Sequence, residues 1–67
     1  MMFTAEEMYL LDGCDMASRR MAIRSLLRNI HITQDDELKE EQTRLCRKLL
    51  DMSDEAFDKM DWTLDDF

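Results

Sequence analysis

The chain has 67 residues, enough for one small domain whose folding buries only about 60% of the surface exposed by the unfolded chain. Its net charge of −7, from 9 basic and 16 acidic residues, argues against a general binder of nucleic acid or of anionic membranes, because phosphate contact requires basic surface. The hydrophobic content of 45% argues against simple disorder. A core of this size also leaves little room for a deep catalytic cavity.

No apolar run approaches the roughly 18 residues of a membrane span, and no basic segment leads into an apolar stretch at the N-terminus. We therefore expect a cytoplasmic protein. Cys14 and Cys46 are too few and too far apart for a disulfide framework of a secreted protein. We interpret both as reduced thiols that pack in the core, the alternatives being a bridge or a reactive site.

Segments of helical periodicity follow one another with short breaks, and the chain has no proline and one glycine. We predict a compact all-α domain of about four helices over residues 1–60, followed by an acidic tail over residues 61–67. The first helix is expected over residues 5–12, because Thr4 and Glu7 have the spacing of a capping box. Phe3 and Met8 would close a hydrophobic staple, and Gly13 would end the helix in the left-handed conformation.

The second helix is expected to begin after a cap at Asp15 or Ser18 and to end near residue 31. Its apolar residues recur at three- and four-residue spacing and are Ala22, Ile23, Leu26, Leu27 and Ile30. A cap at Thr33 or Asp35 begins the third and longest helix, whose buried stripe is Leu38, Leu45, Leu49 and Met52, widened by Cys46 and Leu50. Ser53 begins a short fourth helix that carries Phe57 and Met60.

Residues 16–31 contain four arginines and no acidic residue, which gives this segment a charge of +4. Arg20, Arg24 and Arg28 recur at every fourth position and therefore form one line along the second helix, which we call the arginine ridge. Two interpretations are open. The ridge is either a docking strip for an anionic partner or a solvated face paired with acids elsewhere in the fold, which is the commoner role of surface charge.

The sequence contains no pattern typical of a catalytic or metal site. His31, the only histidine, fits the end of the second helix, where the helix dipole favours a cation. Cys14, His31 and Cys46 are too widely separated for a zinc motif, and the acidic clusters lack the order of a calcium loop. The acidic third helix also argues against a helix-turn-helix that faces phosphate. We predict a non-enzymatic protein without cofactor or metal.

Several motifs resemble the transposon-transfer assisting protein (TTRAP) family. They are FTAEEMYLL at residues 3–11, the pattern Asp15-x-x-Ser18-Arg19, the Asp-Glu-Leu segment at residues 36–38, and KLLDMSDEAF at residues 48–57. Together they are spread over residues 3–57, so the resemblance extends along nearly the whole chain. The resemblance implies a small all-helical bacterial protein, encoded on a conjugative transposon, that contacts proteins needed for transfer of the element.

The family's signature pair, a glutamate in the first helix and a lysine late in the third, would fall on Glu7 and Lys48. The capping box explains Glu7 locally but not Lys48, which lies beside the predicted buried stripe. If the first helix packs across the end of the third, the two charges meet at the edge of the core. We predict an inter-helix ion pair that borders a shallow groove, and the groove is a candidate protein-binding surface. A purely structural role for the pair is the alternative.

These observations predict a monomeric accessory protein that binds a protein of the transposon transfer machinery, with no direct contact to nucleic acid or membrane. The candidate protein-binding residues are Glu7, Lys48, Arg20, Arg24 and Arg28. The first alternative is an acidic mimic of nucleic acid that inhibits a DNA-binding protein. The tail, with Trp62 and a terminal Phe67, also resembles the acidic tips of bacterial single-stranded-DNA-binding proteins, the alternative being a tryptophan that folds back on the core.

Overall fold

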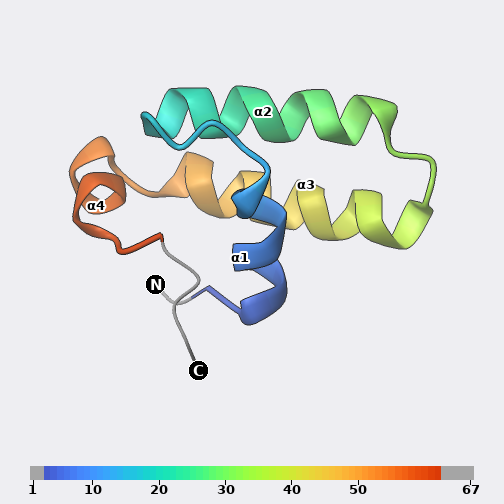
Figure 1. The fold of residues 1–67 in the computed structure, drawn as a ribbon, viewed down its shortest axis with the longest axis horizontal. Coiled ribbons are helices and arrows are strands. Elements are labelled where there is room, and N and C mark those ends of the chain that lie inside the picture. The colour runs from blue at the N-terminus through green and yellow to red at the C-terminus, as the bar shows by residue number, and fades with distance from the viewer. Residues whose placement is uncertain (1–2, 63–67) are drawn as a thin grey trace.

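The computed structural model describes residues 3–62, and residues 1–2 and 63–67 lie outside this range. It contains the helices α1 (Ala5–Asp12), α2 (Arg19–Ile32), α3 (Asp36–Asp51) and α4 (Asp54–Lys59), as Figure 1 shows. The described residues form no strand. The predicted all-α fold with a longest third helix is therefore confirmed.

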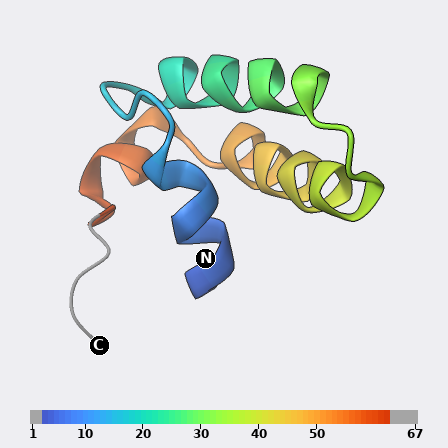
Figure 2. The same cartoon turned by 45° about the vertical axis from the view of Figure 1, so that its right-hand side comes forward.

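The two long helices, α2 and α3, lie side by side as an antiparallel hairpin (Figures 1 and 2). The short α1 crosses the hairpin and contacts α3, while α4 lies against α2 at the end where α3 stops. This arrangement brings the start of α1 near the C-terminal half of α3. That proximity positions the candidate site.

Every helix begins at a polar side chain that accepts backbone N–H groups of its first turn. The caps are Thr4, Ser18, Asp35 and Ser53. At α1 both bonds of the predicted capping box are present: the Thr4 N–H donates to Glu7 Oε1 at 2.8 Å and the Glu7 N–H to Thr4 Oγ1 at 3.1 Å. For α2 and α3, the structure selects the second of the two caps considered in each case.

The predicted left-handed cap at Gly13 is wrong. Its φ of −88° and ψ of 3° lie in a region open to any residue, and a Cβ placed there would meet no atom within 4 Å. Instead, the Cys14 N–H donates to the Leu11 carbonyl at 2.9 Å, a three-residue turn that ends the helix without reversing the sign of φ. The glycine is therefore not needed to end α1.

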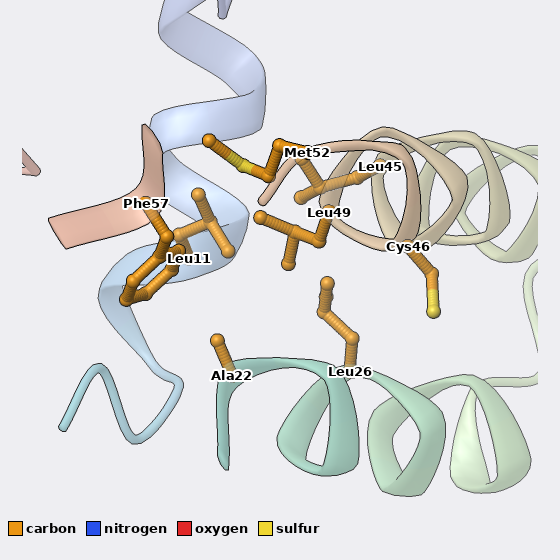
Figure 3. Packing of buried hydrophobic residues seen from close by; sticks show 8 residues of the cluster. All are labelled: Leu11, Ala22, Leu26, Leu45, Cys46, Leu49, Met52 and Phe57. Atoms are coloured by element: carbon orange, nitrogen blue, oxygen red, sulfur yellow. The ribbon is translucent and has the colours of Figure 1, made fainter. Parts of the chain in front are cut away.

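The core lies where α1, the α2–α3 hairpin and α4 meet (Figure 3). Its buried apolar residues are Leu11, Ala22, Leu26, Leu45, Cys46, Leu49, Met52 and Phe57. Of the stripe predicted to be buried on α3, Leu38 is only half-buried and Leu50 keeps 57% of its surface. Leu27, one of the apolar positions of α2, keeps 53%. Leu27 and Leu50 each lie at the border of the apolar stripe of their helix, on a side of the hairpin that no described element covers.

Trp62 joins the C-terminal end of the described chain to its N-terminal end. Its ring centroid lies 5.1 Å from that of Phe3 and 4.9 Å from that of Phe57. Its indole Nε1–H donates to the Phe57 carbonyl at 3.0 Å. The tryptophan of the predicted tail thus folds back on the core, whereas the Phe-terminated tip lies outside the described residues.

Candidate functional site

The ion pair predicted between Glu7 and Lys48 is confirmed. Glu7 lies in the first turn of α1, Lys48 in the last turn of α3, and Lys48 Nζ donates to Glu7 Oε1 at 2.8 Å. The glutamate side chain is 14% exposed and the lysine side chain 34% exposed. The pair therefore lies at the edge of the core, where partial exclusion of water strengthens a charge-assisted hydrogen bond.

Several contacts converge on this pair. Glu7 Oε1 also accepts the Thr4 N–H of the capping box, and the Lys48 ammonium lies 5.2 Å from the centre of the Phe3 ring, within range of a cation–π contact. Burial alone would raise the pKa of Glu7, but the hydrogen bonds from Lys48 and Thr4 and the lysine charge outweigh it. The pKa of Glu7 is consequently lower than its usual 4.5.

A shallow hollow of about 340 Å³ adjoins the pair, as predicted. It is lined by Thr4, Glu6, Glu7, Leu10, Glu41, Arg44 and Lys48. Both acidic and basic side chains line it, and Leu10 is its apolar residue. The hollow has no concentrated charge of one sign, so its electrostatics do not select a particular partner.

The arginine ridge is exposed along its whole length. Arg20, Arg24 and Arg28 are all exposed, and none forms an ion pair with any residue of the range 3–62. No pair can form within α2, because this helix carries no acidic residue, and no acid of another described element pairs with the ridge. Within the described chain the ridge is thus a solvated basic surface and is not paired with acids of the fold.

Arg19, the residue before the ridge, has a role that sequence analysis missed. Its guanidinium bonds Asp54 Oδ1 through Nε at 2.8 Å, and its Nη1 reaches the carbonyls of Leu49 at 3.0 Å and Leu50 at 3.3 Å. These carbonyls belong to the last turn of α3, which leaves such groups without helical partners. Arg19 therefore joins α2 to the end of α3 and the start of α4.

Only weak signals pointed to Arg19. It closes the Asp15-x-x-Ser18-Arg19 motif, and Asp54 is an acid in the first turn of a helix. Neither feature indicates that an arginine reaches carbonyls some thirty residues away in the sequence. Such a contact follows from the packing of the hairpin and not from local periodicity.

Both cysteines are free, as expected of packing residues. Cys14 Sγ donates to the Leu10 carbonyl at 3.4 Å, and Cys46 is buried in the core. Burial raises the pKa of each thiol above its usual value, so that both stay protonated at neutral pH. Their chemistry is that of small apolar side chains.

Residues 3–62 contain no group of three or more His, Cys, Asp or Glu side chains placed to hold a metal ion. No helix of the same range is long and apolar enough to cross a membrane. His31 is exposed in the last turn of α2, where we placed it.

Comparison of the chain with protein-family models, with curated proteins and with solved structures gives no match. The resemblance to the TTRAP family therefore stays a prediction that depends on the quoted motifs. The function proposed below is inferred from those motifs, the fold and the charged sites.

Proposed function

We propose that this chain is a cytoplasmic, non-enzymatic accessory protein of a bacterial conjugative transposon, and that it binds a protein of the transfer machinery as a monomer. The motifs shared with the TTRAP family support the genomic role. One observation supports the mode of action: Arg20, Arg24 and Arg28 stay solvent-exposed and unpaired with described residues in a protein of net charge −7. A basic surface of this kind complements an acidic protein surface.

Two other basic residues of the site, Lys48 and Arg19, have internal contacts. Lys48 fixes α1 on α3, and Arg19 fixes α2 on the end of α3 and the start of α4. In this proposal the Glu7–Lys48 pair maintains the shape of the domain, and the ridge contacts the partner. The hollow beside the pair is the alternative to the ridge as the partner's binding surface, because it is open and borders α1 and α3.

The acidic mimic of nucleic acid remains the competing function. A mimic needs carboxylates on one continuous surface in place of phosphates. Here the exposed face of α2 is basic and interrupts such a surface, which favours the protein-binding proposal. The two functions also differ in the side chains that they require, since a mimic depends on its acids and an adaptor on the ridge.

The test is an affinity pull-down from cells that carry the intact element. The variant R24E/R28E reverses two ridge charges, and the matched control R44E/K59E makes the same change in net charge at exposed positions of α3 and α4. We expect the wild type and the control to retain one specific transfer protein and R24E/R28E to lose it. Loss in the control alone would favour the hollow, which Arg44 lines, and retention in both would refute binding through the ridge.

A further inference from the structure

We propose that the uncovered face of the α2–α3 hairpin binds an acidic amphipathic helix of the partner protein. This inference rests on the proposed function and names the chemistry of the partner. It derives from where the exposed leucines and the basic side chains lie relative to α1.

The hairpin has one covered and one uncovered face. On the covered face, Lys48 of α3 pairs with Glu7 of α1. The segment after α1 contacts α2 through the Asp15 N–H, which donates to Ser25 Oγ at 3.1 Å. Figure 1 shows this segment and α1 on the same side of the hairpin. At about 100° of rotation per residue, positions two residues apart lie on nearly opposite sides of a helix. Leu27 is therefore opposite Ser25, and Leu50 is opposite Lys48. They therefore share the uncovered face.

This uncovered face, which we call the open face, has an apolar centre. Leu27 of α2 and Leu50 of α3 are 53% and 57% exposed, and Ile23, partly buried, lies one turn before Leu27. Cys46 lies beneath them in the core at 5% exposure. Exposed leucines on two adjacent helices are typical of a groove that accepts the apolar side of a third helix.

Basic side chains border the apolar centre without interruption on the α2 side, which has no acid, whereas on the α3 side they share a hollow with Asp36, Glu37 and Glu40. Arg20 and Arg24 follow the α2 side, and Lys39 and Arg47 follow the α3 side. All four are exposed, and none forms an ion pair with a described residue. A ligand helix that fits this face needs an apolar stripe flanked by acidic residues, which is the definition of an acidic amphipathic helix.

The charge of the whole chain favours binding of such a ligand at the open face. The protein carries −7 overall, so most of its surface repels an acidic helix, and the open face attracts it. Attraction at one face combined with repulsion elsewhere gives specificity as well as affinity. An uncharged or basic helix would gain neither effect.

The test uses a synthetic helical peptide of about 18 residues, with leucines at i, i+3, i+4 and i+7 and with glutamates on both flanks. Binding to the full chain is followed by NMR titration of the backbone amides. We expect shifts confined to α2 and α3 around Leu27 and Leu50. A peptide of the same composition with scrambled order should bind about tenfold more weakly or not at all.

Two double variants locate the contact. L27Q/L50Q changes the open face, whereas Y9Q/I32Q changes exposed apolar residues elsewhere, which are 69% and 68% exposed. Because all four side chains are exposed, both variants should keep the wild-type melting temperature. We expect L27Q/L50Q to weaken peptide binding about tenfold and Y9Q/I32Q to change it less than about twofold.

Other occupants of the face would overturn the proposal. A membrane surface would be revealed by binding to vesicles of anionic lipid that depends on Leu27 and Leu50, and a second copy of the chain by self-association with the same dependence. The chain's own residues 63–67 would be revealed by shifts of the open-face amides when these residues are deleted. Equal binding of the scrambled peptide, or no peptide binding at all, would also overturn it. If the peptide fails while R24E/R28E still loses its partner in cells, the proposed function stands and only the helix chemistry is wrong.

Discussion

The Glu7 carboxylate of α1 lies within hydrogen-bond distance of the Lys48 ammonium of α3, and the same oxygen, Oε1, accepts the Thr4 N–H; both distances are 2.8 Å. The same oxygen atom therefore caps the start of α1 and joins α1 to α3. An apolar residue in place of Glu7 removes both effects, whereas an apolar residue in place of Lys48 removes only the second.

The pair should show energetic coupling. We expect Glu7→Met to destabilise the domain more than Lys48→Met, because methionine cannot accept the Thr4 N–H of the capping box. A double-mutant cycle measured by urea unfolding should give a coupling energy of about 1 kcal/mol, a modest value because the lysine is partly solvated. Additive effects within about 0.3 kcal/mol would show that the contact contributes nothing to stability.

The pair should also make stability depend on pH. The pKa of Glu7 is lower in the folded chain than its usual 4.5, so its stabilising contribution is fully present above that pH and is lost as the pH falls through the lower folded value. The difference in unfolding free energy between the wild type and Glu7→Gln should accordingly shrink between neutral pH and about pH 3. A difference that stays constant over this range would contradict the lowered pKa.

Arg19 should matter more to stability than the ridge arginine beside it. Arg19→Met removes the donor to the Leu49 and Leu50 carbonyls and should cost about 1–2 kcal/mol of unfolding free energy, whereas Arg20→Met should cost less than about 0.5. Asp54→Asn should resemble Arg20→Met, because the Asp54 side chain is 80% exposed. Equal costs for Arg19→Met and Arg20→Met, measured by chemical denaturation, would refute the structural role of Arg19.

Gln42 should be replaceable with a gain in stability. It is the buried polar residue of the described core, 6% exposed, and its Oε1 has no hydrogen-bond partner. Gln42→Leu removes an unsatisfied acceptor and adds apolar volume of similar size, so we expect a gain of about 1 kcal/mol and a melting temperature higher by roughly 4–8 °C. Calorimetry of the two proteins tests this, and a lower melting temperature for the variant would mean that the amide is satisfied in solution.

Sequence patterns predicted the helices well because each begins with a side-chain cap, a local signal that packing does not alter. The ends of α1 matched the capping box and the apolar period, and Ser53 fixed the start of α4. The Glu7–Lys48 contact was predicted from the family resemblance together with the expected crossing of two helices.

The errors arose where tertiary packing decides the outcome. Leu27 and Leu50 fit the apolar period of their helices, but the period cannot tell which edge of a hairpin a third element covers. Gln42 was not expected in the core because its side chain is polar. Its position along α3, and not its polarity, determines its burial. Gly13 was assigned a left-handed conformation because glycine commonly follows the last residue of a helix, although a right-handed turn also closes that end.

The central claim is that the arginine ridge contacts a protein partner and the hollow beside Glu7 does not. Site-specific photocrosslinking in cells that carry the element tests it most directly. The crosslinking side chain is placed either at Arg28 on the ridge or at Glu6 in the hollow, both exposed positions. We predict one specific crosslinked protein from position 28 and none from position 6. A crosslink from position 6 alone would contradict the claim.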